Sequence, residues 1–255
     1  MTNQNIYEIE LPSSSSEIQN YPKKIKISTL TVQAFKLYSN LTSDNFMSVL
    51  KDVLSVCIQD KDIKAGNLKF NDAFYLLLWL RINSALPGNS DELTYDVTCQ
   101  NNHSFKHTTK LSGIEIRKLD GYTEPVKIKL NSFPDQSVFL KILSFDEEIE
   151  LVTLIKNNDP LYSENMQTIR AAYSINASLS LKEKLRFLDS LNDISDLAAI
   201  LDFIEKYSNW GFTYIDRRVK CPECGSESDA VLPLTPDIFI PILQYSGYFE
   251  KSRVT

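Results

Sequence analysis

Two short motifs with metal-binding residues constrain this chain more than any other feature of its sequence. The first is Cys99-Gln-Asn-Asn-His103, and the second is Cys221-Pro-Glu-Cys224-Gly. A tetrahedral Zn²⁺ takes four thiolate or imidazole ligands, and two ligands separated by about two to four residues can reach one ion from a single hairpin turn. Each motif follows a strand-like segment and leads toward another, as in a zinc ribbon. We therefore predict one structural zinc ion per chain, bound by Cys99, His103, Cys221 and Cys224.

Some of these assignments have alternatives in the sequence. His107 competes with His103, but the shorter loop to His103 is the usual ligand spacing. Cys221 and Cys224 could form a redox pair, although such a pair normally begins a helix, and here Gly-Ser-Glu-Ser-Asp and a strand pattern follow. Cys99 could be a core residue. Metal binding is the interpretation that accounts for all of these residues together.

Composition and charge exclude several broad classes of protein. The 255 residues include 43% hydrophobic side chains, which is enough for a large core, and the net charge of −6 disfavours general binding to a phosphate backbone. The longest apolar run, from Ala73 to Leu80, has eight residues and is too short to cross a bilayer. The first residues lack a basic segment followed by an apolar one, so we expect no signal peptide and a reducing, cytoplasmic environment.

Hydrophobic periodicity predicts the elements of the amino-terminal half. Residues 23–29 alternate as a strand does, and their three lysines indicate an exposed sheet edge. Between residues 43 and 58 apolar side chains recur at helical spacing, and Cys57 lies on that face, so we interpret it as a packing residue. Between residues 71 and 81 apolar side chains surround the whole helix, as expected of a helix packed on every side.

The hydrophobic period changes twice in the second half of the chain. After residue 88 it becomes two, in the segments LTYDVT, SFKHTT, IEIRKL, VKIKL and VFLKIL, which predicts a β-rich middle. At Ser144 the helical period returns, and Ser144 with Glu147 forms a capping-box pattern that Ser180 with Glu183 repeats. We expect helices up to about residue 210 and strands again beyond Gly211.

These patterns together predict an α+β fold in four parts. Residues 1–22 form an extended arm, which is either a binding arm or a loose chain end, and residues 23–90 form a helical core region. Residues 91–143 and 211–255 form a β-rich, zinc-stapled domain. Residues 144–210 form a helical insertion into that domain.

The sequence contains none of the common motifs of enzymatic chemistry. It has no Gly-rich phosphate-binding loop, no His-Glu-x-x-His and no Gly-x-Ser-x-Gly. Its two histidines, His103 and His107, are at or beside the predicted zinc site. Four protein ligands leave no open position for water or substrate on the metal, so the zinc is predicted to be structural. We therefore expect no catalytic residues and no small-molecule substrate.

The order of the motifs resembles a known family. LPS at residues 11–13, an amphipathic helix, NDAFYLLLWLRINS at residues 71–84 and the first metal-binding motif follow one another. This order resembles the baseplate hub and hub-assembly proteins of T-even-like contractile-tailed phages, best from about residue 10 to about residue 130. The resemblance implies binding to other baseplate and tail proteins, as a resident of the hub or wedge or as a chaperone that leaves before maturity. It also implies assembly in the host cytoplasm and a place in the virion tail baseplate.

A second function class is a zinc-ribbon adaptor that binds nucleic acid or a transcription or processing complex. Arg217, Arg218 and Lys220 lie beside the second motif and could contact a phosphate backbone. Aromatic side chains, on which bases would stack, are sparse around them. We therefore prefer a solvated strand face for these cations, and we expect neither nucleic-acid nor membrane partners.

Overall fold

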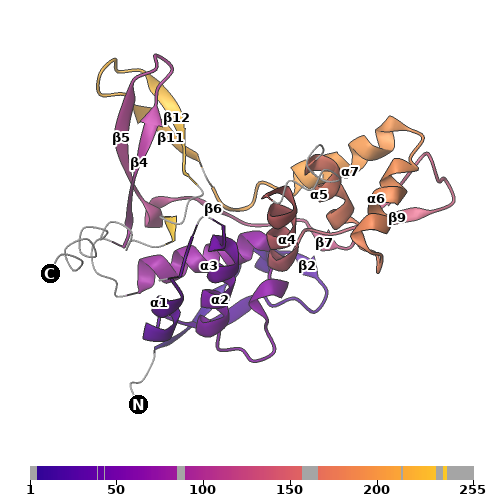
Figure 1. The fold of residues 1–255 in the computed structure, drawn as a ribbon, viewed down its shortest axis with the longest axis horizontal. Coiled ribbons are helices and arrows are strands. Elements are labelled where there is room, and N and C mark those ends of the chain that lie inside the picture. The colour runs from indigo at the N-terminus through magenta and orange to yellow at the C-terminus, as the bar shows by residue number, and fades with distance from the viewer. Residues whose placement is uncertain are drawn as a thin grey trace.

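Helices and small two-stranded sheets alternate along the chain, which confirms the predicted α+β class. The structure, a computed structural model, describes residues 5–38, 40–42, 44–84, 90–156, 166–213, 215–233 and 238–239. Figure 1 shows three parts in space: an amino-terminal helical part, a projecting pair of β-hairpins and a second helical part. The predicted zinc-stapled domain extends to residue 255, and its last residues lie outside the described chain.

The amino-terminal part is built around one central helix. The helix α3 (Phe70–Asn83) packs against α2 (Phe46–Cys57), and α1 (Val32–Tyr38) packs against α2. The apolar side chains of α3 are buried or half-buried on all of its faces, which confirms the prediction for residues 71–81. Strands β1 (Ile6–Glu10) and β3 (Lys24–Ser28) form an antiparallel pair that joins the same hydrophobic core.

The strand predicted at residues 23–29 is present as an edge strand of a two-stranded sheet, and its outer side is covered in part. β3 pairs with β1 on one side, and Ile27 forms a bridge with Ile58 on the other. Ile25 and Ile27 are fully buried, and the lysines alternate with them. The local pattern shows which side chains face solvent, and it does not show that residue 58 covers part of the outer side of the strand.

Residues 6–18 are integrated into the fold. After β1, the turn Pro12–Ser15 places Leu11 and Ser13 in buried positions. The short strand β2 (Glu17–Ile18) then pairs in parallel with β7 (Thr123–Glu124). The amino-terminal segment thus links the central helix to residues in the middle of the chain.

Two β-hairpins project from the body and lie side by side at their turns (Figure 1). The first consists of β4 (Glu92–Thr98) and β5 (Ser104–Lys110), and the second of β11 (Ile215–Lys220) and β12 (Glu227–Val231). Side chains alternate along β4, with one face buried and the other exposed. The buried side chains of both hairpins belong to the same core as α3.

The second helical part follows the predicted helical block. Its helices are α4 (Phe145–Lys156), α5 (Met166–Ser174), α6 (Leu181–Asp189) and α7 (Ile194–Lys206). The predicted capping boxes are present: Ser144 with Glu147 exchange hydrogen bonds at the start of α4, and Ser180 with Glu183 do so at the start of α6. Among the described residues, no helix is both long enough and apolar enough to cross a membrane.

Short strands connect these parts. β6 (Ile116–Arg117) pairs with β10 (Gly211–Phe212), and β8 (Val126–Lys129) pairs with β9 (Ser137–Leu140). Side chains of residues 119–140 form a second hydrophobic cluster with α5, α6 and α7. The middle of the chain therefore packs partly on the second helical part, and the division into four domains stays a prediction.

A buried carboxylate ties the amino-terminal segment to α3. Asp72 is fully buried and accepts hydrogen bonds from the Ser13 N–H at 3.1 Å, the Ser13 hydroxyl at 2.5 Å and the Tyr21 hydroxyl at 2.8 Å. Burial is the largest influence on this carboxyl and raises the pKa of Asp72 to about 6, although the three donors oppose the shift. The interaction fixes residues 13–21 against the central helix.

The raised pKa of Asp72 predicts a pH-dependent stability. The ordinary pKa of this carboxyl is 3.8, so the folded chain keeps the proton to a higher pH than the unfolded chain does. The stabilisation that comes from binding this proton is therefore fully present below the unfolded pKa, and it is lost as the pH rises through about 6. Asp72→Asn has no group that titrates at this position, so its stability does not share this loss. The free energy of unfolding of the variant minus that of the parent should therefore increase by about 2 kcal/mol from about pH 4 to about pH 7. Urea unfolding at both pH values measures this difference, and a difference that does not change with pH would contradict the assignment.

Candidate metal centre

The first predicted motif forms the turn between β4 and β5. The Cys99 N–H donates to the His103 carbonyl oxygen at 3.0 Å, and the Asn102 N–H donates to the Cys99 carbonyl oxygen at 2.9 Å. Asn102 has a φ of +61°, in the left-handed region that asparagine tolerates better than most residues. Cys99 and His103 therefore lie at the two ends of one tight turn.

The second motif forms the turn between β11 and β12. The Cys221 N–H donates to the Ser226 carbonyl oxygen at 2.9 Å, and the Gly225 N–H donates to the Cys221 carbonyl oxygen at 2.9 Å. Gly225 has a φ of +70°, which a residue with a side chain adopts only with strain. The glycine after Cys224 thus lets the chain turn back into β12 directly after the second cysteine.

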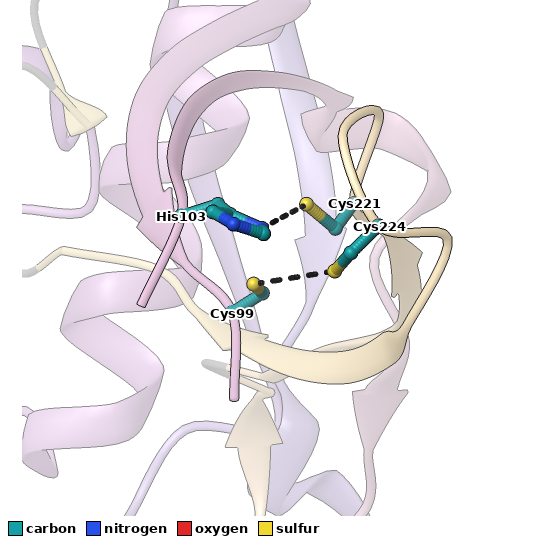
Figure 2. Close-up of side chains that lie close together, drawn as sticks. All are labelled: Cys99, His103, Cys221 and Cys224. Carbon is teal, nitrogen blue, oxygen red and sulfur yellow. Dashed lines mark hydrogen bonds between the residues drawn. The ribbon is translucent and has the colours of Figure 1, made fainter. Parts of the chain in front are cut away.

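The two turns bring the four predicted residues together. Figure 2 shows the side chains of Cys99, His103, Cys221 and Cys224 pointing toward one another from the two loops. Their ligand atoms all lie within 4.8 Å of one another. The Sγ atoms of Cys99 and Cys224 are 3.8 Å apart, and the Sγ atom of Cys221 is 3.8 Å from Nδ1 of His103. The cluster could therefore hold a metal ion.

The donor set and the spacing fit Zn²⁺. A tetrahedral zinc ion about 2.3 Å from each sulfur separates two sulfurs by about 3.8 Å. The distance between the Cys99 and Cys224 sulfurs has this value, 3.8 Å, and both residues are free cysteines, as are Cys57 and Cys221. Three thiolates and one imidazole form a common set of ligands in structural zinc sites.

Hydrogen bonds to sulfur favour the thiolate form of Cys224, the one exposed cysteine of the cluster. The Ser226 hydroxyl lies 3.1 Å from the Cys224 Sγ atom, and the Asn101 side-chain N–H donates to the same sulfur at 3.4 Å. These donors, Ser226 first, lower the pKa of Cys224 to about 5, against the opposing effect of burial. The thiolate is the form of cysteine that binds metals.

The remaining histidine and cysteine lie outside the cluster. His107 lies on β5 opposite Tyr95, and the centroids of the two rings are 5.7 Å apart. Cys57 is fully buried on α2, and burial raises the pKa of its thiol to about 12. Cys57 is therefore a packing residue, as its helical spacing predicted. The structure places His103, rather than His107, beside the three cysteines of the cluster.

The local structure also bears on the redox alternative for Cys221 and Cys224. The chain after Cys224 turns directly into β12, and no helix begins there. The pair therefore lacks the helix amino terminus that lowers the thiol pKa in common redox motifs. The spacing of two residues between Cys221 and Cys224 is also the one found in structural zinc sites.

Three polar residues around the cluster were not predicted. Asn101 and Ser226 contact the Cys224 sulfur, and Glu223 has a carboxylate oxygen 3.8 Å from Nε2 of His103. All three lie within or directly after the two motifs, so their positions in the sequence were visible. Their contacts were not, because Asn101 and Glu223 each reach across to a residue of the other loop.

A polar groove of about 640 Å³ adjoins Cys99. Arg218 lines it together with two acidic side chains, Glu227 and Asp229. Arg218 lies at an irregularity in the pairing of β11 with β12 and has a φ of +65°. The side chain of Arg217 lies outside the described residues. The acidic neighbours of Arg218 make this groove a poor surface for phosphate groups.

Comparison with protein families gives a match over nearly the whole chain. Residues 4–240 match the family described as "T4 bacteriophage base plate protein". Neither the search of curated proteins nor the search of solved structures found a match. The family match spans both metal-binding motifs and nearly the whole sequence, and it agrees with the resemblance seen in residues 10–130. The chain therefore belongs to the T4 bacteriophage base plate protein family.

Proposed function

We propose that this protein is a structural or assembly subunit that binds other hub or wedge subunits of a contractile-tailed phage baseplate. Membership of the baseplate family supports a structural role in the phage tail. The resemblance of the motifs along residues 11–103 to those of baseplate hub and hub-assembly proteins supports the hub or wedge as its place. In this role the protein acts through protein surfaces and has no small-molecule substrate.

We infer further that one structural zinc ion joins the two projecting hairpins. The observation that carries this inference is the convergence of Cys99, His103, Cys221 and Cys224 from loops that are distant in sequence. With four protein ligands the ion has no open position for water or substrate, so it would stabilise the fold and take no part in a reaction. Zinc would then hold the hairpins in a fixed arrangement for a partner.

Co-purification with the neighbouring baseplate subunits tests this function. The chain would be co-expressed with each hub and wedge subunit of the same phage, and complexes would be identified by size-exclusion chromatography with light scattering. We expect a stable complex with at least one subunit, and we expect Cys221→Ser to weaken it. Cys57→Ala is the matched control, because it removes a buried thiol outside the cluster. Failure to bind any hub or wedge subunit would refute the proposed role.

Binding to nucleic acid is the competing function, and the groove beside Cys99 argues against it. Arg218 is exposed there, but Glu227 and Asp229 line the same groove. Fluorescence anisotropy with labelled DNA and RNA at physiological salt distinguishes the two functions. We expect no binding, and salt-sensitive binding that Arg218→Ala removes would favour the adaptor function instead.

A further inference from the structure

The two ring nitrogens of His103 face different groups. Nδ1 lies 3.8 Å from the Sγ atom of Cys221, on the side of the cluster. Nε2 lies 3.8 Å from a carboxylate oxygen of Glu223. A neutral imidazole has one nitrogen that carries a proton and one with a free lone pair, and only the second can bind a metal. The surroundings of the ring therefore distinguish its two nitrogens.

We propose that His103 binds the metal through Nδ1 and that Glu223 accepts a hydrogen bond from Nε2–H, which makes Glu223 a positioning residue of the metal centre. This inference rests on the metal centre proposed above. Metal-bound histidines almost always donate the proton of the other nitrogen to a carboxylate, a carbonyl or water, and this bond fixes the tautomer and the orientation of the ring. Glu223 is the carboxylate beside that nitrogen, and the present separation of 3.8 Å would shorten to hydrogen-bond distance in the metal-bound chain.

An ion pair between His103 and Glu223 would add little to the stability of the fold, because both side chains are partly exposed. The side chains of His103 and Glu223 are 36% and 60% exposed. An exposed ion pair contributes little to stability, because water screens both charges. The same carboxylate has a larger effect on a metal-bound imidazole, because it restrains a ring that must keep one orientation.

The contacts between the two loops are reciprocal in this arrangement. Glu223 of the second loop faces His103, a ligand residue of the first loop. Asn101 of the first loop donates a hydrogen bond to Cys224, a ligand residue of the second loop. Each loop would thus supply two ligands and one side chain that orients a ligand of the other. The Cys-Pro-Glu-Cys motif would contribute through its glutamate as well as its thiolates.

Nitrogen NMR of the zinc-loaded, full-length chain tests the assignment of the ring nitrogens. Two-bond ¹⁵N–¹H correlations distinguish a proton on Nε2 from one on Nδ1, and we expect the proton of His103 on Nε2. His107 provides an internal reference, because it lies outside the cluster. Coordination through Nε2 would overturn the proposal while leaving the metal centre in place.

Zinc affinity tests the role of Glu223. In competition with a chromophoric chelator, Glu223→Ala should lower zinc affinity about 10-fold or more. Glu223→Gln should lose less zinc affinity than Glu223→Ala, because the amide oxygen of glutamine still accepts a hydrogen bond. Glu227→Ala, which removes an exposed carboxylate on β12, is the matched control and should leave affinity unchanged. Equal affinities for the two alanine variants would overturn the proposal, and a parent chain that takes up no zinc would refute the metal centre itself. Circular dichroism of each variant shows whether its fold is retained.

Discussion

A double variant, Cys221→Ser with Cys224→Ser, is expected to lose the fixed arrangement of the two hairpins. Each hairpin is a two-stranded sheet, which is marginally stable in water, and the cluster joins their turns. Structural zinc supplies on the order of 10 kcal/mol to isolated finger domains. Since apolar contacts between the hairpins and the central core remain, we expect the local stability of β11–β12 to fall by about 5 kcal/mol. Hydrogen exchange of amides in β4, β5, β11 and β12, measured in the presence of zinc, reports this loss.

Two comparisons make the result specific to the metal centre. Chelation of the parent protein should reproduce the exchange pattern of the double variant. Cys57→Ala should leave the hairpin amides protected from exchange, because Cys57 lies on α2 outside the cluster, and its substitution should cost about 1 kcal/mol. If the hairpin amides of the double variant exchanged as slowly as those of the parent, the cluster would not hold the two hairpins together.

The second large effect is expected for Asp72→Ala. This substitution removes the acceptor for the Ser13 N–H, the Ser13 hydroxyl and the Tyr21 hydroxyl. A buried donor without a partner costs about 1 to 3 kcal/mol, and hydroxyl groups can turn toward other acceptors, so we expect a total loss of about 4 kcal/mol. Residues 6–18 should exchange their amide protons faster, because this carboxylate holds them against α3. Urea unfolding measures the global loss, and hydrogen exchange measures the local one.

The exposed ion pair between Glu8 and Lys24 provides the control for Asp72→Ala. Their side chains are 53% and 58% exposed, so Glu8→Ala should change stability by less than about 1 kcal/mol. At neutral pH, Asp72→Asn should lower the free energy of unfolding much less than Asp72→Ala does, because the asparagine amide retains an acceptor oxygen. An Asp72→Ala variant as stable as the parent would show that the network does not hold the amino-terminal segment.

Local sequence patterns predicted most of the helices, although α1 was not among them. Apolar spacing located α2 and α3, and the serine-glutamate pairs located the starts of α4 and α6. These features depend on residues within one or two helical turns, so the information is contained in a short segment. The period of two likewise located both strands of the β4–β5 hairpin.

Long-range pairing could not be predicted in the same way. The pattern of residues 23–29 shows a strand, but its neighbours, β1 and Ile58, come from separate segments. Residues 119–140 were expected among the strands of the zinc-binding part, yet their apolar side chains pack with α5, α6 and α7. A strand pattern indicates which side chains are buried and leaves open the surface on which they are buried.

The candidate metal site shows the same distinction. Ligand spacing within each turn identified Cys99, His103, Cys221 and Cys224, because each pair is local. The side chains around them act across the two loops, and the contact of Asn101 with Cys224 appears only once the loops lie together. The family match identifies the baseplate, whereas the partner subunit depends on surfaces that the sequence pattern does not specify.

Native mass spectrometry before and after chelation tests the central claim, that one metal ion joins the two hairpins. We predict one zinc ion per chain in the purified protein. Chelation should remove this ion and shift the charge states toward those of a partly unfolded chain. A chain without metal, or a mass lower by two hydrogens with a disulfide between Cys221 and Cys224, would contradict the claim.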